Sequence, residues 1–377
     1  IDLHVTEVVL PSASEASTGQ DDQSHPELRE IVSELMSTPL DYSMALWKCE
    51  IIRYQSDRTA MLVRVHHCVT DGQGGIRCLL DITNNAHNTE LQYGKHTKPT
   101  QALLSSSWKQ RALQALQLFI LLLQLAWGAV LGLWHFFMTL VFFKRSHFKG
   151  QLTTDKMVSF TNDVDLNNVK TIKNHFNVSV NDVLIASLAG SFREYILKTD
   201  GAVKDKDLLT YIPFSMRKAD DWELGNKVSV VMAKLPLNIE DPVERLMEVH
   251  KRMNTIKNSK EPIVTYYITE YLGNSRFADH PISQWVLRHL LSKPHAVFTN
   301  VPGPREHLQF CGKTIQSLTP FIPQPGEGGI GVSLLSYADK VACSLVADRD
   351  LLANGNEISS GLASHIEHLR QLVPVSQ

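Results

Sequence analysis

The sequence lacks an excess of charge of either sign. Its 377 residues carry 37 lysines and arginines against 39 aspartates and glutamates, for a formal net charge of −2. Proteins that hold phosphate backbones carry a basic excess, so nucleic acid is excluded as the main partner. Short-period repeats and low-complexity tracts are also missing, and 43% of the residues are hydrophobic, which is the range of a globular chain.

Cysteine is scarce and never lies in C-x-x-C spacing. This excludes a disulfide framework and a cysteine zinc site, and it favours a reducing, cytosol-facing environment. The five cysteines are Cys49, Cys68, Cys78, Cys311 and Cys343.

The length exceeds what one hydrophobic core usually supports, so two lobes are expected. No signal peptide is visible, because the sequence does not start with a charged segment, a short apolar core and a small-residue cleavage site. Residues 1–10 already have the pattern of a strand. We therefore expect a fragment or a processed form, with an N-terminal lobe that is incomplete at its start.

One long apolar run stands out from this average composition. Residues 118–143 contain only Gln124, His135 and Thr139 as clearly polar members. About twenty apolar residues suffice to cross a bilayer as a helix. A buried core helix is the alternative, but no face of the run is polar, so membrane contact is favoured. Basic residues flank the run on both sides: Lys109, Arg111, Lys144, Arg145 and Lys149.

The run divides the chain into an N-terminal lobe (1–105), a connector (106–150) and a C-terminal lobe (151–377). Strands and helices mix without strict βαβ alternation, which predicts an α/β chain with mixed sheets of α+β type. Strands are expected at 1–10, 44–54, 60–66, 156–160, 208–214, 228–235, 296–301, 331–337 and 340–347. Helices are expected at 26–38, 76–84, 165–176, 180–197, 242–258 and 357–372, with a turn at 71–75.

The sharpest local signal is His66-His67-Cys68-Val69-Thr70-Asp71-Gly72, where a strand runs into a tight turn. Neighbouring strand residues point to opposite faces, so we expect one histidine to face the core and the other a cleft. An imidazole can take a proton from a hydroxyl, Asp71 can pair with an arginine to hold the turn, and Gly72 permits unusual backbone angles. The plainer alternative is a core histidine at His67 and an Asp71 that only caps the next helix. No H-x-x-x-H pair or cysteine cluster supplies further ligands, so no metal site is expected.

Five segments in order resemble the wax ester synthase/diacylglycerol acyltransferase family, within the acyltransferases related to chloramphenicol acetyltransferase. The histidine segment resembles the HHxxxDG motif of that superfamily. The other segments resemble the family's PLD…PLW, ND, LGN and SNVPGP motifs, and the resemblance covers about residues 1–372. They are Pro39-Leu40-Asp41 with Leu46-Trp47, Val180–Leu184, Leu224-Gly225-Asn226 and Thr299–Pro304.

Some positions depart from the family's pattern. Met44-Ala45 stands where the family commonly has Arg-Pro, Lys48 replaces a usual Glu, and Thr299 replaces a usual Ser. The DFGWG motif of plant-type HxxxD acyltransferases is absent from the sequence, which counts against that branch.

The resemblance implies two chloramphenicol-acetyltransferase-like lobes with a channel between them, where acyl-CoA and an acceptor alcohol meet. It implies that His67 is the general base, with His66, Asp71 and Gly72 completing the motif. No acyl-enzyme is required and no cofactor is expected beyond acyl-CoA as co-substrate. Cys68 is accordingly interpreted as a packing residue.

Five further residues are candidates for substrate binding or oxyanion contact. Asn181 can donate an amide N–H to an oxyanion or cap the helix that begins there, and Asp182 can equally serve that helix N-terminus. Asn226, Asn300 and Gly303 are expected to shape turns beside the channel.

A single membrane crossing at 118–143 would put the two lobes on opposite sides and destroy a shared channel. Positive charge on both flanks favours two cytosolic ends. We therefore expect a re-entrant hairpin bent near Gly128–Gly132 or a helix lying in one leaflet. The lobes would face the cytosol at the endoplasmic reticulum, the plasma membrane or a lipid-droplet surface.

The function that follows is transfer of a fatty acyl group from acyl-CoA to a long-chain alcohol or diacylglycerol, giving wax ester or triacylglycerol. The alternatives are transfer to a sterol-like or small alcohol, and a catalytically vestigial lipid-binding membrane protein.

Overall fold

A computed structural model describes residues 3–11, 26–55, 57–85, 153–218, 223–259, 261–274, 294–322, 329–352 and 354–374. It also describes residues 147, 148, 221, 280, 281, 284 and 285, and single positions between 112 and 134.

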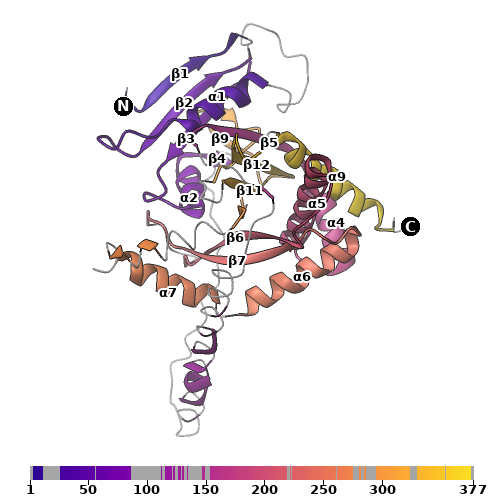
Figure 1. Cartoon of the computed structure of the whole chain (residues 1–377). Coiled ribbons are helices and arrows are strands. Elements are labelled where there is room, and N and C mark those ends of the chain that lie inside the picture. Colours follow the sequence, from indigo (N-terminus) through magenta and orange to yellow (C-terminus); the bar gives the residue numbers. More distant parts are fainter. Residues whose placement is uncertain are drawn as a thin grey trace.

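The N-terminal part forms a small three-stranded sheet. β1 (Val5–Val9) runs parallel to β2 (Trp47–Arg53), which pairs antiparallel with β3 (Thr59–Val65). Helix α1 (Pro26–Ser37) lies between this sheet and the rest of the molecule (Figure 1). Every second strand residue packs inward, as the alternating pattern predicts, so Ile52 is fully buried.

The C-terminal part is organised around a six-stranded mixed sheet in the order β5-β12-β11-β8-β6-β7. β8 runs parallel to both of its neighbours, and the remaining pairs are antiparallel. The predicted mixed α/β architecture is therefore confirmed. The strands are β5 (Lys156–Asp165), β6 (Asp207–Ser215), β7 (Val228–Pro236), β8 (Ala296–Pro302), β11 (Ile330–Tyr337) and β12 (Lys340–Asp348).

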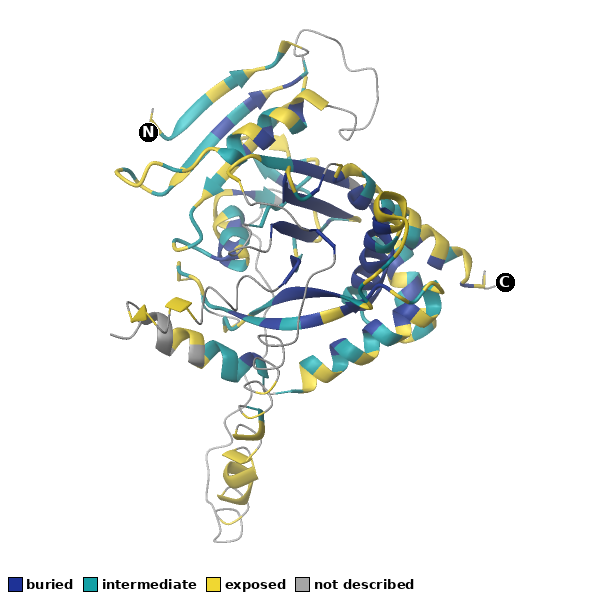
Figure 2. Cartoon of the chain, viewed as in Figure 1, coloured by how far each residue is buried: buried dark blue, intermediate teal, exposed yellow. Residues whose placement is uncertain are grey.

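One face of this sheet is covered by helices, with α5 at the centre. The α5 helix packs against α6 and α9 as well as the sheet, so it is buried on nearly every side (Figure 2). Apolar residues on all faces, such as Val183 and Leu188, fit that position. The helices of this layer are α4 (Leu166–Phe176), α5 (Val180–Asp200), α6 (Pro242–Asn258) and α9 (Asn356–Gln371).

The two parts are joined along a strand edge. The edge strand β5 leaves backbone N–H groups unpaired, and the hydroxyls of Ser37 and Ser33 on α1 accept from Lys156 and Val158 at 2.8 and 3.0 Å. These bonds cover an edge that is otherwise open to pairing with other chains.

Short strands make a second junction. β4 (Asn84–Asn85) pairs with β9 (Leu308–Phe310), which pairs with β10 (Lys313–Thr314). The predicted lobe boundaries at 105/106 and 150/151 lie outside the described residues and stay predictions.

Most of the predicted apolar segment 118–143 also lies outside the described residues. The positions described between 115 and 134 are helical and carry exposed apolar side chains; Trp127 is 64% exposed. Figure 1 shows these purple pieces standing away from the sheets.

Across the part of the chain that is described, no helix is both long and apolar enough to cross a bilayer.

One predicted element is wrong, and one helix was not predicted. Residues 71–75 are not a turn, because helix α2 spans Gly72–Ile82 and begins directly after Asp71. Helix α7 (Glu261–Asn274) was not predicted, since its β-branched and aromatic residues give no clear helical stripe.

Candidate active site

The two histidines of the HHxxxDG segment lie in the turn between β3 and α2. β3 ends at Val65, so neither histidine is on the strand, and both side chains are half-buried. The strand alternation behind the expected core-facing and cleft-facing histidines is therefore absent, and that division stays a prediction. The alternative of a core residue at His67 is wrong, because His67 is only half-buried. No described residue hydrogen-bonds to the His67 ring, whereas His66 Nε2 lies 3.2 Å from Tyr42 Oη.

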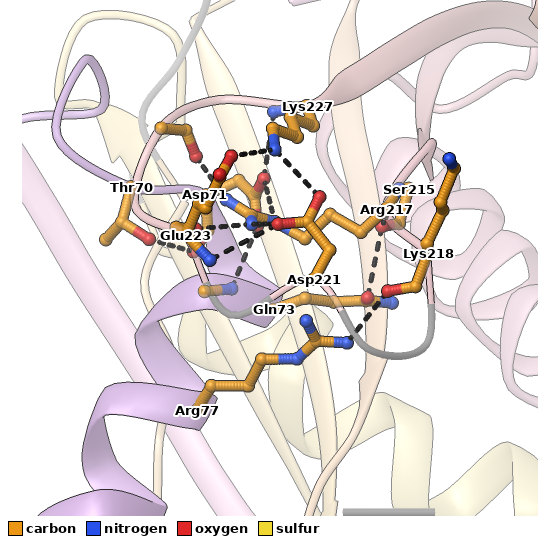
Figure 3. A network of polar contacts seen from close by, with 12 residues as sticks. Thr70, Asp71, Gln73, Arg77, Ser215, Arg217, Lys218, Asp221, Glu223 and Lys227 are labelled. Atoms are coloured by element: carbon orange, nitrogen blue, oxygen red, sulfur yellow. Dashed lines mark hydrogen bonds and ion pairs between the residues drawn. The ribbon is translucent and has the colours of Figure 1, made fainter. Parts of the chain in front are cut away.

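Asp71 is buried and its carboxylate is fully engaged (Figure 3). Oδ1 accepts from the Gly74 backbone N–H at 2.9 Å and caps α2. Arg217 Nε donates to Oδ1 and Oδ2 at 3.0 and 2.8 Å, and the Lys227 backbone N–H donates to Oδ2 at 3.0 Å. Helix cap and arginine partner, weighed as separate roles in the sequence, are both present. The carboxylate therefore holds the turn and its oxygens face protein donors.

The loop between β6 and β7 supplies those donors and is bonded to the histidine turn. The Asp71 N–H donates to the Gly225 carbonyl at 3.3 Å, and the Gly225 N–H donates to the Val69 carbonyl at 2.8 Å. The Arg217 guanidinium also donates to the Gly225 carbonyl and, at 2.6 Å, to that of Glu223. Gly225 has φ +121°, a conformation that residues with a Cβ rarely adopt. The LGN and HHxxxDG segments thus form one unit.

Ion pairs close the outer side of this loop. Lys227 Nζ lies 2.8 Å from an Asp221 oxygen and 2.9 Å from a Glu223 oxygen. The hydrogen bond from Lys227 holds the pKa of Asp221 below its ordinary value, and the same bond raises the pKa of Lys227.

Space calls for a glycine at position 74, just after the motif, whereas neither space nor backbone angle requires one at position 72. The described glycines with positive φ do not include Gly72, so the expected unusual backbone there is wrong. A Cβ on Gly72 would lie 3.6 Å from a methyl of Val301, an ordinary contact. A Cβ on Gly74 would lie 2.1 Å from Thr70 Oγ1 and 3.1 Å from an Arg217 nitrogen, so these side chains would have to shift.

Two asparagines from distant segments meet beside this unit. The Asn300 amide nitrogen donates to Asn181 Oδ1 at 3.2 Å. Asn300 is followed by Val301, whose methyl faces Gly72, so the SNVPGP-like segment lies between the ND-like segment and the histidine motif.

Asp182 points elsewhere. Ser179 is the N-cap of α5, and its hydroxyl and the Asp182 carboxylate exchange bonds with each other's backbone N–H groups. The Asp182 carboxylate is fully buried, with His250 Nδ1 at 2.8 Å and Lys257 Nζ at 3.7 Å. Its helix-terminus role is confirmed, and its candidacy for substrate contact stays a prediction. Helix capping by Asn181 is wrong as well, because Ser179 does this.

The turn role expected of Asn300 is wrong, because Asn300 lies within β8 (Ala296–Pro302), and the other two candidates lie in connecting segments. Asn226 is exposed, and Gly303 follows the main run of β8 with its N–H donating to the Ser336 carbonyl at 3.0 Å. A Cβ on Gly303 would lie 2.4 Å from that carbonyl, so the close approach explains the glycine.

The fifth segment, PLD…LW, also reaches the motif. The Leu46 carbonyl accepts from the His66 N–H at 2.9 Å, and Tyr42 follows Asp41 directly. The LGN-like and LW segments are therefore bonded to the histidine turn, and Val301 of the SNVPGP-like segment lies beside it, whereas the ND-like segment contacts Asn300. Sequence reasoning missed Arg217, because nothing near position 217 marks it, and missed the cap at Ser179, although Ser-x-x-Asp before an apolar run signals one.

Among the described residues, no group of three His, Cys, Asp or Glu side chains could hold a metal ion, and the absence of a metal site stays a prediction.

Two profiles match the chain. The wax ester synthase/diacylglycerol acyltransferase catalytic domain matches residues 1–184, and the WS/DGAT C-terminal domain matches residues 224–370. A probable diacylglycerol O-acyltransferase of Mycobacterium tuberculosis is 25% identical over 97% of this chain and 78% of its own. The O-acyltransferase WSD of Acinetobacter baylyi is 26% identical over 99% and 81%.

Solved structures share the fold. The wax ester synthase/diacylglycerol acyltransferase of Marinobacter aquaeolei VT8 superposes with a TM-score of 0.64 at 18% identity, over 99% of this chain and 80% of that one. The first condensation domain of the calcium-dependent antibiotic synthetase gives 0.52 at 12% identity, over 98% and 75%. The resemblance inferred from the five motifs is confirmed, and the chain belongs to the wax ester synthase/diacylglycerol acyltransferase family of acyl-CoA-dependent O-acyltransferases.

Proposed function

We propose that this chain transfers a fatty acyl group from acyl-CoA to a long-chain alcohol or diacylglycerol, with His67 as general base. The observation that carries the proposal is the histidine turn, which is bonded to the LGN-like and LW segments and lies beside Val301, and in which no described residue hydrogen-bonds to the His67 ring. A base that must meet a substrate hydroxyl needs that freedom.

The chemistry takes one displacement. His67 removes the proton of the acceptor hydroxyl, and the oxygen attacks the thioester carbonyl. The tetrahedral intermediate collapses, the carbon–sulfur bond breaks, and the imidazolium returns the proton to the CoA sulfur. General-base catalysis of this kind contributes roughly 10²- to 10⁴-fold. Asp71 and Arg217 act through the turn by holding the histidines in place, and no acyl-enzyme is needed in this route.

Asn181 is the proposed oxyanion donor. Its Oδ1 accepts from Asn300, so the amide nitrogen at the other end of the Asn181 side chain is turned away from Asn300. A donor of this kind is worth about 10²- to 10³-fold in rate when it faces developing negative charge. A channel between the lobes, with acyl-CoA and acceptor entering from opposite sides, is part of the same proposal.

The test uses the full chain with radiolabelled palmitoyl-CoA and, in separate reactions, hexadecanol, diacylglycerol, a sterol and a short alcohol. Wild type is expected to form wax ester or triacylglycerol, and His67→Ala is expected to form almost none while keeping the wild-type circular dichroism spectrum. Equal product from both proteins would refute the general base. Product only with the sterol or the short alcohol would identify that alcohol as the acceptor instead. No product with any acceptor would favour a lipid-binding role.

Membrane contact is a second part of the proposal. Exposed apolar side chains at the helical positions between 115 and 134 support it, including Leu118, Leu122 and Trp127 at 58, 55 and 64% exposure. Basic residues on both flanks suit an anionic lipid surface. A hairpin or in-plane helix at 118–143 would keep both lobes on the cytosolic side of the endoplasmic reticulum, plasma membrane or lipid droplet.

Vesicle flotation tests the contact. Replacing Leu118, Leu122 and Trp127 by serine is expected to release the protein from phosphatidylcholine/phosphatidylserine vesicles. The matched control replaces three exposed apolar residues on the C-terminal helices, Leu197, Met247 and Leu372, and is expected to stay bound. Release of both variants alike, or protease protection that places the two lobes on opposite sides, would contradict the proposal.

A further inference from the structure

Cys68 lies beside a ring nitrogen of His66. The Cys68 side chain is exposed, and its Sγ is 3.0 Å from His66 Nδ1. On the far side of the same ring, Nε2 lies 3.2 Å from Tyr42 Oη, with the two rings edge to face. A thiol, a base within reach of it and a third group that orients the base are the parts of an activated nucleophile.

The backbone fixes which nitrogen of His66 is the acceptor. The Cys68 backbone N–H lies 3.3 Å from Nδ1, and a backbone N–H can only donate. Nδ1 therefore carries the lone pair, and in the neutral ring the proton sits on Nε2, where Tyr42 Oη accepts it. The thiol at 3.0 Å is the nearer partner of that lone pair, so its proton has a base to move to.

The other cysteines offer an internal comparison. Cys78 and Cys311 are exposed too, but no described residue places a ring nitrogen next to either sulfur. Cys343 is fully buried in the core, which raises the pKa of its thiol to about 12. Cys68 is the cysteine with both access and a base.

We propose that Cys68 accepts an acyl group from acyl-CoA, with His66 as the base. His66 Nδ1 takes the thiol proton and Sγ attacks the thioester carbonyl, forming a new carbon–sulfur bond. The bond from that carbon to the CoA sulfur then breaks, and the CoA thiolate takes the proton from Nδ1. The products are S-acyl-Cys68 and free CoA, so atoms and charge balance without any further reactant.

The expected electrophile is the thioester carbonyl of acyl-CoA, because acyl-CoA is the acyl donor in the proposed function. The inference rests on the proposed function, which brings the thioester carbonyl to His67, the residue between His66 and Cys68 in the chain. A thioester that reacts at His67 is therefore delivered to the turn that also carries the Cys68 thiol. The reaction is separate from transfer to an alcohol, because it uses the other histidine and needs no acceptor.

The experiment treats the full chain with alkyne-tagged palmitoyl-CoA in the absence of acceptor and locates the label by mass spectrometry. Label is expected on Cys68, removable by hydroxylamine as a thioester is. It is expected to be lost in Cys68→Ser, to fall about a hundredfold in initial rate in His66→Gln, and to persist in the matched controls Cys78→Ser and Cys311→Ser.

A second measurement does not depend on any variant. Wild-type protein is alkylated with limiting iodoacetamide, and Cys68 is expected to react faster than Cys78 and Cys311. Undiminished label in Cys68→Ser, or alkylation of Cys68 no faster than of the other two, would overturn the inference. Each sample is also assayed for wax ester and triacylglycerol. Product without label on Cys68 refutes only this inference, and label without product refutes only the proposed function.

Discussion

Arg217 Nε donates to both carboxylate oxygens of Asp71, at 3.0 and 2.8 Å, from a loop 146 positions further along the chain. Both side chains are out of contact with solvent, at 0 and 1% exposure. The pair ties the turn that carries the histidines to the loop between β6 and β7. A buried charge without its partner lowers the free energy of unfolding, so loss of either residue alone is expected to destabilise the protein. We call the pair the Asp71–Arg217 clamp, because together the two side chains fix the turn to the loop.

Arg217→Met is expected to lower the free energy of unfolding by about 3–5 kcal/mol, because it strands the Asp71 carboxylate in the interior. Urea unfolding measures this. In an Asp71→Asn background, Arg217→Met is expected to lower the free energy of unfolding much less, because no buried carboxylate is left without its partner. Equal decreases in both backgrounds would contradict the clamp. The matched control is Arg349→Met, which removes a surface pair with the 70%-exposed Glu30 and is expected to cost under about 1 kcal/mol.

Gly74→Ala is expected to destabilise the protein by about 1–3 kcal/mol, because the new Cβ overlaps Thr70 Oγ1 and crowds the Arg217 guanidinium that holds Asp71. Acyl transfer is expected to fall with it, since the same turn holds His67. Gly75→Ala is the control one position later. A Cβ there meets nothing within 4 Å, so Gly75→Ala is expected to raise the free energy of unfolding by about 0.4–1 kcal/mol. Thermal unfolding of the two variants compares them directly, and equal shifts of the same sign would refute the steric argument.

Asp221 predicts a pH dependence. Its folded-state pKa is lowered from 3.8 by the hydrogen bond from Lys227, so its ionised form is favoured by folding. That stability is present above the unfolded pKa and is lost as pH falls through the folded one. Asp221→Asn is therefore expected to unfold at lower urea than wild type at neutral pH, with the difference shrinking below pH 3.8. In a Lys227→Gln background the difference is expected to shrink but not vanish, because the Glu223 backbone N–H and Arg217 also lower the pKa of Asp221, and an undiminished difference would contradict the role of Lys227.

The Asn181–Asn300 contact predicts coupled kinetics. Asn181→Ala is expected to lower kcat about 10²- to 10³-fold with little change in KM, because an oxyanion donor acts in the transition state. Asn300→Ala is expected to lower it less, and the double variant to match Asn181→Ala alone. Fully additive losses would show that Asn300 does not act through Asn181. Asn174→Ala, at an exposed position of α4, controls for loss of an asparagine and is expected to leave kcat unchanged.

Local signals were enough to predict most elements of the fold. The helix α6 was predicted at its observed bounds, since Pro242 is at its first position, and the structure adds Asp241 as its cap. The strands of the six-stranded sheet were predicted within a few residues because apolar runs and alternation depend only on nearby positions. The pattern failed for the two- and three-residue strands β4, β9 and β10, which are too short to have a period, and for α7.

For the candidate site, more depended on the tertiary structure. By itself the sequence determined which residue types are present and in what order, and those motifs were enough to indicate the family. Only the tertiary structure decided which of them meet. It turned Asp182 toward His250, gave Asp71 its partner Arg217 and set Cys68 against His66. The reason is physical: helix and strand signals are carried by residues within a few positions of each other, whereas a buried charge is satisfied by whatever donor the packing of distant elements brings to it.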